Sequence, residues 1–132
     1  MRLVCILLLL ATGCVSSIHE DPYLRLAAKM TRVEQALQFF RLDFRRFPTT
    51  EEGLAALVET PDKLMSSQAP ETTYAKPSLV LDIWGNPFEY SNPGACPTGH
   101  PQLTSLGPDG LHGGRGRDLT ICVGLGWATK DP

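Results

Sequence analysis

A glycine-rich stretch, SLGPDGLHGGRGRDLTI at residues 105–121, holds the densest group of chemically active side chains in this sequence. It contains a histidine, two arginines and two carboxylates, Asp109 and Asp118. A phosphate-binding P-loop needs a lysine followed by serine or threonine after the glycines, and an EF-hand needs alternating oxygen ligands and a closing glutamate. The stretch satisfies neither requirement. The residues alone therefore leave a turn between two strands or a less regular metal site.

Groups suited to catalysis are scattered along the chain. His19, His100 and His112 fall on a predicted tether and two predicted loops. No serine stands in a G-x-S-x-G motif, and no C-x-x-C pair is present that would indicate a zinc site or a redox centre. The sequence therefore predicts a protein that is not an enzyme.

The size and charge of the chain exclude two further classes. At 132 residues it has room for one small domain, and its 42% hydrophobic content is normal for a globular core. The formal net charge is −2, whereas a nucleic-acid-binding surface needs an excess of basic residues. We expect one folded domain and no nucleic acid as a partner.

The N-terminal segment has the pattern of a bacterial export signal. Arg2 precedes an apolar run over residues 3–10 that is too short to span a bilayer, for which roughly 20 residues are needed. The following LATGC resembles a lipobox, the motif in which a cysteine is freed by cleavage and acylated. We therefore expect a signal peptide at residues 1–13, lipidation of Cys14, and a lipidated tether at residues 14–20. An ordinary cleaved signal peptide is the alternative.

The four cysteines divide according to this prediction. Cys5 would leave with the signal peptide and Cys14 would carry the lipid, which leaves Cys96 and Cys122. Export to an oxidising compartment would allow these two to form a disulfide. Two free buried thiols remain the alternative.

The folded part is predicted to begin with a long helix over residues 22–47. Asp21 can cap it, Pro22 suits its first position, and Pro48 would end it. Apolar residues recur at steps of three and four, so one face should be buried. The apolar positions at 23–30 exceed what a small sheet would cover, which suggests a partner helix. The apolar positions are Tyr23, Leu26, Ala27, Met30, Val33, Leu37, Phe40, Phe44 and Phe47.

A second, short helix and a set of strands are predicted to follow. Thr49 and Glu52 have the spacing of a capping box, and Pro61 would end this helix. Residues 60–78 suit a loop, residues 79–84 a strand or a buried extended segment, and residues 85–87 a turn. Three more short strands are expected at 88–90, 103–106 and 119–123. Short strands with close connections favour an antiparallel meander, so the fold class is α+β.

Three motifs in this order resemble the globular domain of one known family. FRLDFRRFPTTEEGLAALV at residues 40–58, DIWGNPFEY at 82–90 and SLGPDGLHGG at 105–114 are similar to segments of the G-type major pseudopilin of bacterial type II secretion systems. The resemblance covers most of residues 25–121. It implies a pilin-like domain over residues 21–132, with a long N-terminal helix packed on a small antiparallel sheet and a loop-rich C-terminal region.

The resemblance also implies a calcium ion in the glycine-rich loop. By the family's motif, the carboxylates of Asp109 and Asp118 and the hydroxyl of Thr120 would be ligands, together with the backbone carbonyls of Leu106 and Leu111. Calcium accepts such mixed oxygen ligands. The positive charges of Arg115 and Arg117 oppose a divalent cation, so the prediction requires these two side chains to point away from the site.

The N-terminus departs from the resembled family. Family members follow their leader with a glutamate and an apolar anchor helix, whereas this chain has Ile18 and a polar segment there. We therefore expect a lipid-anchored component of the secretion system in the bacterial cell envelope, either periplasm-facing or an outer-membrane lipoprotein, that does not itself form filaments. Its partners would be pseudopilin-like proteins or other secretion-system components. The alternative is a free-standing calcium-binding envelope lipoprotein that acts as a binding module.

Overall fold

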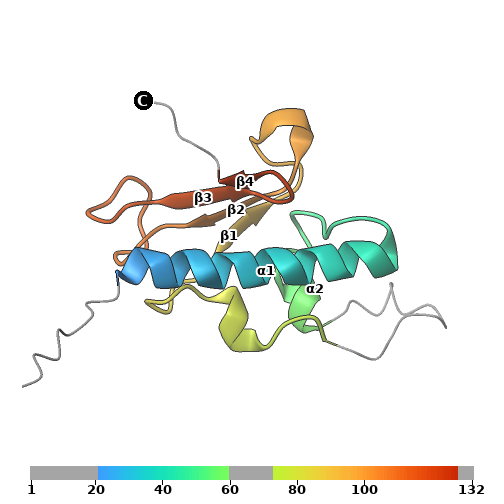
Figure 1. Cartoon of the computed structure of the whole chain (residues 1–132), viewed down its shortest axis with the longest axis horizontal. Coiled ribbons are helices and arrows are strands. Elements are labelled where there is room, and N and C mark those ends of the chain that lie inside the picture. Colours follow the sequence, from blue (N-terminus) through green and yellow to red (C-terminus); the bar gives the residue numbers. More distant parts are fainter. Residues whose placement is uncertain (1–20, 60–72, 128–132) are drawn as a thin grey trace, which may run out of the picture.

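The computed structural model describes residues 21–59 and 73–127 (Figure 1). The predicted signal peptide, the Cys14 lipidation site and the tether lie outside the described residues, as do Pro61 and most of the predicted loop at 60–78. In the described part of the chain, no helix is both long and apolar enough to cross a membrane.

The long helix α1 spans Pro22–Phe44. Its start is as predicted, because the Asp21 side chain accepts a 2.9 Å hydrogen bond from the backbone N–H of Tyr23. Its predicted end at residue 47 is wrong. Arg45 adopts a left-handed conformation with φ of 59°, which closes the helix three residues before Pro48.

The sheet is a four-stranded antiparallel meander in the order β1-β2-β3-β4. Its strands are β1 (Glu89–Ser91), β2 (Gln102–Ser105), β3 (Leu119–Cys122) and β4 (Gly126–Trp127). The first three match predicted strands within about one residue, and β4 was not predicted. Leu103 pairs with Ile121 in the register of β2 and β3, and both side chains are buried.

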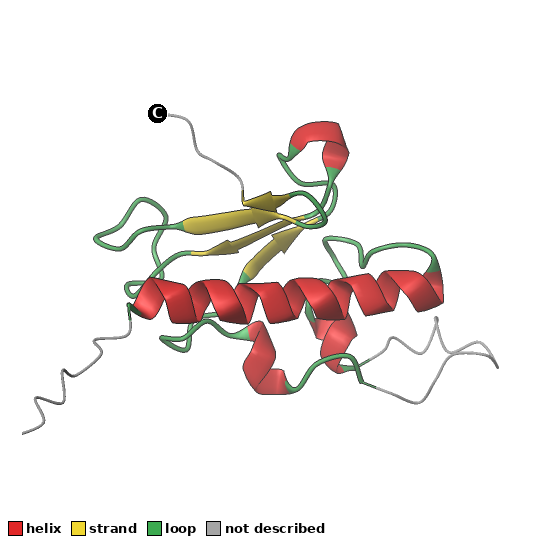
Figure 2. Ribbon diagram, viewed as in Figure 1, coloured by secondary structure: helices red, strands yellow, loops and turns green. Residues whose placement is uncertain are grey.

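One hydrophobic core joins α1 to the sheet. Figure 2 shows α1 running between the sheet on one side and two short helices on the other. Phe40, Leu37 and Val33 of α1 belong to the same buried cluster as Leu103 and Ile121. The chain therefore has the predicted α+β, pilin-like arrangement of a long helix on a small antiparallel sheet.

The apolar residues that were counted at the start of α1 are largely covered by the chain itself, although Leu24 on the outer face is exposed. Leu26 and Met30 are fully buried within the chain's own core. Tyr23 packs edge-to-face on Trp84, with ring centroids 5.7 Å apart. The segment that carries Trp84 covers these residues together with the sheet, so they do not require a partner helix.

The predicted capping box forms at the turn that follows α1. Glu52 accepts a bond from the N–H of Thr49 at 2.8 Å, and its own N–H donates to the Thr49 hydroxyl at 3.2 Å. Arg46 binds the same carboxylate with both terminal nitrogens, which lowers the pKa of Glu52. The box leads into turns before the helix α2 (Ala55–Val58) begins.

The same turn is tied to strand β1. The hydroxyl of Tyr90 and the amide of Asn92 both donate to the carbonyl of Pro48, at 2.9 and 2.8 Å. Burial raises the pKa of Tyr90, so its hydroxyl remains protonated and continues to donate. The FPTTEE segment therefore fixes where the chain leaves the helix and where β1 begins.

The apolar run at 79–84 is neither a strand nor a simple extended segment. Its first residues belong to a 3₁₀ helix, η2 (Pro77–Val80), and Leu81 makes an isolated bridge to Pro87. Between these bridge partners the chain turns, with Gly85 at φ of 90°. A strand of this length cannot form because the turn begins at Asp82, whose carboxylate binds the backbone within it.

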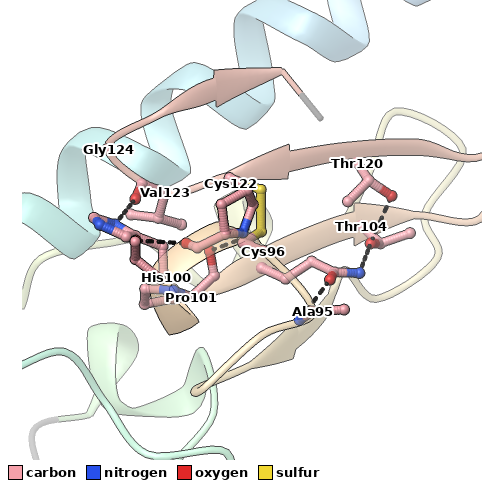
Figure 3. Close-up of a disulfide and its surroundings, with 12 residues drawn as sticks. Ala95, Cys96, His100, Pro101, Thr104, Thr120, Cys122, Val123 and Gly124 are labelled. Carbon is pink, nitrogen blue, oxygen red and sulfur yellow. Dashed lines mark hydrogen bonds between the residues drawn. A yellow bond between two sulfur atoms is a disulfide. The ribbon is translucent and has the colours of Figure 1, made fainter. Parts of the chain in front are cut away.

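Cys96 and Cys122 form a disulfide in the structure (Figure 3), with their Cα atoms 5.7 Å apart. Cys96 lies in the connection between β1 and β2, next to the 3₁₀ helix η3 (Pro97–Gly99), and Cys122 ends β3. Both residues are buried. The bridge therefore fastens a loop of irregular structure to the sheet.

Candidate functional site

A buried carboxylate, Asp82, lies beneath the loop that joins β2 to β3. Its Oδ1 accepts hydrogen bonds from the N–H groups of Trp84 and Asn86, each at 2.9 Å. Its Oδ2 accepts from the hydroxyl of Ser105, the last residue of β2, at 3.0 Å. Asp82 is only 3% exposed, so these partners satisfy a charge that water barely reaches. This carboxylate thus joins two of the three sequence motifs.

Asn86 extends the same connection into the loop. Its side-chain N–H donates to the carbonyl of Gly107 at 3.0 Å. A Cβ on Gly110 would lie 3.1 Å from the Asn86 side chain, and Gly110 has φ of +66°. Glycine is therefore required at this position for two reasons, the close approach of Asn86 and the left-handed backbone.

Within the loop, Asp109 organises the backbone around itself. Its Oδ1 accepts from the N–H of Leu111 at 3.3 Å, and its Oδ2 accepts from the N–H of Arg115. A Cβ on Gly114 would lie within 2.1 Å of Oδ2, so this turn closes tightly only because residue 114 is glycine. Asp109 therefore acts in this structure as the centre of a compact turn.

The second predicted carboxylate, Asp118, contacts the same turn and has an unused oxygen. Its Oδ2 accepts from the N–H of Gly113 at 3.3 Å and lies 4.0 Å from Nδ1 of His112. His112 in turn contacts the carboxylate of Glu89 on β1 at 3.0 Å. The other oxygen of Asp118, Oδ1, is buried and has no hydrogen-bond partner among the described residues. A buried carboxylate oxygen without a partner is costly, so it favours a ligand at this point.

The two arginines of the loop do not neutralise these aspartates. The Arg117 guanidinium lies over the ring of Tyr23, 5.3 Å from its centroid, and its backbone N–H donates to the Tyr23 hydroxyl at 3.0 Å. Arg115 is exposed. Neither arginine forms an ion pair with Asp109 or Asp118 in the described part of the chain. Arg117 therefore points away from the two aspartates, as the calcium prediction required.

The remaining predicted ligands are placed less favourably. The carbonyl of Leu111 accepts from the N–H of Gly114 at 3.1 Å. The hydroxyl of Thr120 lies 2.9 Å from that of Thr104, across the β2–β3 pair. Leu106 is the first residue after β2. Over residues 21–59 and 73–127, no group of three or more histidine, cysteine or acidic side chains is arranged to hold a metal ion. A metal here would depend on backbone carbonyls beside the two carboxylates.

Sequence analysis missed the three residues that fix the loop in place, Asp82, Asn86 and Ser105. A signal was present, because Asp82 is a lone carboxylate in the apolar run 79–84 and is followed by a turn sequence. An aspartate at such a position commonly binds the backbone two residues ahead. Its bond to Ser105, 23 residues away, could not be derived from spacing along the chain.

Comparison with known proteins gives one consistent result. The family model for "Type II secretion system (T2SS), protein G" matches residues 17–124. The type II secretion system core protein G of Pseudomonas aeruginosa is 35% identical over 129 residues, covering 92% of this chain and 87% of that protein. The corresponding protein of Klebsiella pneumoniae is 36% identical over 88 residues, covering 66% of this chain and 61% of that protein. The chain thus spans about three fifths of the length of some relatives.

The fold agrees with a solved structure of the same kind. The crystal structure of the major pseudopilin from the type 2 secretion system of enterohaemorrhagic Escherichia coli matches with a TM-score of 0.57 and 29% identity, over 75% of this chain and 84% of that chain. The three motifs that carried the sequence resemblance are the segments that interlock through Asp82, Asn86 and Pro48. This chain belongs to the type II secretion system protein G family.

Proposed function

We propose that this protein is a structural component of a type II secretion system in the cell envelope, where it works with pseudopilins or other parts of the apparatus. The family match over residues 17–124 carries this proposal. The fold adds support, because hydrogen bonds interlock the three motifs that this chain shares with the family. In this proposal the domain acts through the surfaces that it presents to other components.

We further propose that the domain is attached by lipid at Cys14 and does not itself form filaments. The lipobox-like LATGC supports the attachment, and the polar residues that follow it, including Ser16, Ser17 and Glu20, support a tether in place of a helical anchor. A domain held in this way would bind or cap the assembly instead of extending it.

Deletion of the gene should lower the extracellular level of enzymes exported by the host's type II system, and these enzymes should accumulate in the periplasm. Expression of the full chain should restore secretion, and the chain should co-purify from solubilised membranes with pseudopilins or other secretion components. Unchanged secretion after deletion would contradict the proposal and favour a free-standing binding module.

The proposed lipidation of Cys14 can be tested separately by growing cells with labelled palmitate and measuring the label in the purified protein. The wild-type chain should be labelled, and Cys14→Ser should abolish the label because the thiol is the site of acylation. Cys5→Ser is the matched control, since it removes a nearby thiol inside the predicted signal peptide and should leave the label unchanged. A label that persists in Cys14→Ser would show that the acyl chain is attached elsewhere.

A calcium-binding role for the β2–β3 loop is the second candidate function. The observation that favours it is the buried Oδ1 of Asp118, which has no hydrogen-bond partner among the described residues. Asp109 and Asp118 contact the same turn, and Arg117 points away toward Tyr23. Bound calcium would supply the missing partner of Asp118 and would order the loop. The carbonyls of Leu106 and Leu111 would complete the ligand set.

Removal of calcium should lower the melting temperature by several degrees. A ligand at about 100 times its dissociation constant stabilises the folded state by about 2.7 kcal/mol. The measurement is thermal unfolding in excess calcium and in excess chelator. Asp118→Ala should remove the difference, whereas Glu89→Gln should keep it, since this neighbouring acid is not a predicted ligand. Identical melting curves for the wild type in both buffers would exclude a calcium site.

A further inference from the structure

A basic groove lies along the first half of α1. Its volume is about 790 Å³, and it runs between α1 and the segment that contains η2. Arg25, Lys29 and Arg32 line it from the helix, at steps of four and three residues that place them on one side. Lys76 lines the opposite wall. Lys29 donates to the carbonyl of Asp82 at 3.3 Å, which holds its charge inside the groove.

Within residues 21–59 and 73–127, none of these four cations forms an ion pair. Among the described residues that line the groove, Asp82 is the sole carboxylate, and it already accepts hydrogen bonds from three other groups. The ion pairs of the described chain involve Arg46 and His112 and none of the groove cations. The whole chain carries a net charge of −2, so the positive charge is concentrated locally. Charge complementarity therefore favours an anionic occupant.

Beside this groove, the outer face of α1 carries a stripe of uncharged residues that is apolar at both ends. The stripe has six exposed residues at steps of three or four, over about 27 Å of helix. Leu24, Phe39 and Leu42 are 70%, 60% and 64% exposed. In Figure 1, no described element crosses in front of α1. The stripe consists of Leu24, Ala28, Thr31, Gln35, Phe39 and Leu42.

We propose that α1 lies along the surface of a membrane that contains anionic phospholipids. Lipid phosphate groups occupy the basic groove, and Leu24, Phe39 and Leu42 enter the headgroup region. An exposed apolar stripe flanked by lysine and arginine is the pattern of helices that bind in the plane of a membrane surface. The inference rests on the proposed lipid at Cys14, which is at most about 25 Å of extended chain from Asp21. An acid-rich protein segment would match the groove but not the apolar stripe.

The test uses the full chain reconstituted into phosphatidylcholine vesicles with or without phosphatidylglycerol. Flotation reports attachment, and acetylation of Lys76 by a water-soluble reagent reports whether the groove is covered. With phosphatidylglycerol, Lys76 should react several-fold more slowly than in neutral vesicles, and high salt should restore the rate. Arg25→Gln with Arg32→Gln should weaken the association roughly 30-fold and remove the protection. The control variant, Arg41→Gln with Arg115→Gln, loses the same amount of charge outside the groove and should retain the protection of Lys76.

The outcomes separate this inference from the proposed anchor. If the chain floats with both vesicle types but Lys76 is not protected, the groove proposal is overturned and the proposed lipid anchor is still supported. Flotation with anionic vesicles alone supports the groove and contradicts the anchor, and flotation with neither contradicts both. Protection that is equal in neutral and anionic vesicles overturns the assignment to anionic phospholipids. Protection that is equal with and without vesicles indicates a protein occupant, such as a second copy of this chain.

Discussion

Replacing Asp82 by alanine is expected to lower the free energy of unfolding by about 3 to 5 kcal/mol. The substitution removes one carboxylate and leaves the N–H groups of Trp84 and Asn86 and the hydroxyl of Ser105 without their acceptor. Ser105 is fully buried, so water cannot replace the lost partner there. Urea denaturation followed by circular dichroism gives the free energy.

Asp82→Asn is the matched comparison for this prediction. The amide keeps an oxygen for the N–H groups of Trp84 and Asn86, and its nitrogen can donate to the Ser105 oxygen. We expect a loss of only about 1 kcal/mol. Equal stability of the alanine and asparagine variants would contradict this prediction, because asparagine keeps both the volume of Asp82 and an acceptor for the two N–H groups. Ser105→Ala should give a loss between the two, because it removes one of the three bonds to Asp82 and the bond that the Ser105 hydroxyl accepts from the N–H of Gly107.

Removal of the Cys96–Cys122 disulfide is the second large expected effect. The cysteines are 26 residues apart, and closing a loop of that length stabilises a protein by roughly 3.5 kcal/mol in the chain-entropy account. Cys96→Ala with Cys122→Ala should lower the free energy of unfolding by about this amount. Alanine is preferred over serine because both positions are buried and a hydroxyl there would lack a partner.

The redox state of these cysteines checks the same prediction independently. In protein isolated from the envelope, an alkylating reagent applied before reduction should leave Cys96 and Cys122 unmodified, and mass spectrometry after reduction should detect both. The reduced wild-type chain should unfold at the same urea concentration as the double alanine variant. Free thiols at both positions before reduction would refute the bridge in the native protein.

The lost disulfide should affect the sheet more than the helix. Gln102 accepts from the N–H of Ala95 and donates to the Thr104 hydroxyl, and the carbonyl of Pro101 accepts from the N–H of Val123 (Figure 3). These bonds hold the irregular connection that contains Cys96 against β2 and β3. Hydrogen exchange should therefore increase first in residues 93–99, because Asn92 and His100 at the two ends of this segment keep their hydrogen bonds to Pro48 and Val123.

The sequence by itself determined the elements whose causes are local. Asp21 caps α1, Thr49 and Glu52 form the capping box, and apolar spacing identifies the buried face of the helix. Each of these features depends on residues within one or two turns of one another. The order of motifs was sufficient to indicate the family because the motifs themselves encode these local structures.

The tertiary structure alone decided how distant groups meet. The end of α1 depends on Arg45 and on the turn that Arg46 and Glu52 stabilise, so the rule that a helix ends before proline placed it three residues late. The apolar run at 79–84 turns because Asp82 reaches both its own backbone and Ser105. Burial of Leu26 and Met30 likewise required knowing which segment lies on them. Periodicity reports which face of a helix is apolar, whereas only contacts between elements far apart in the chain decide what covers that face.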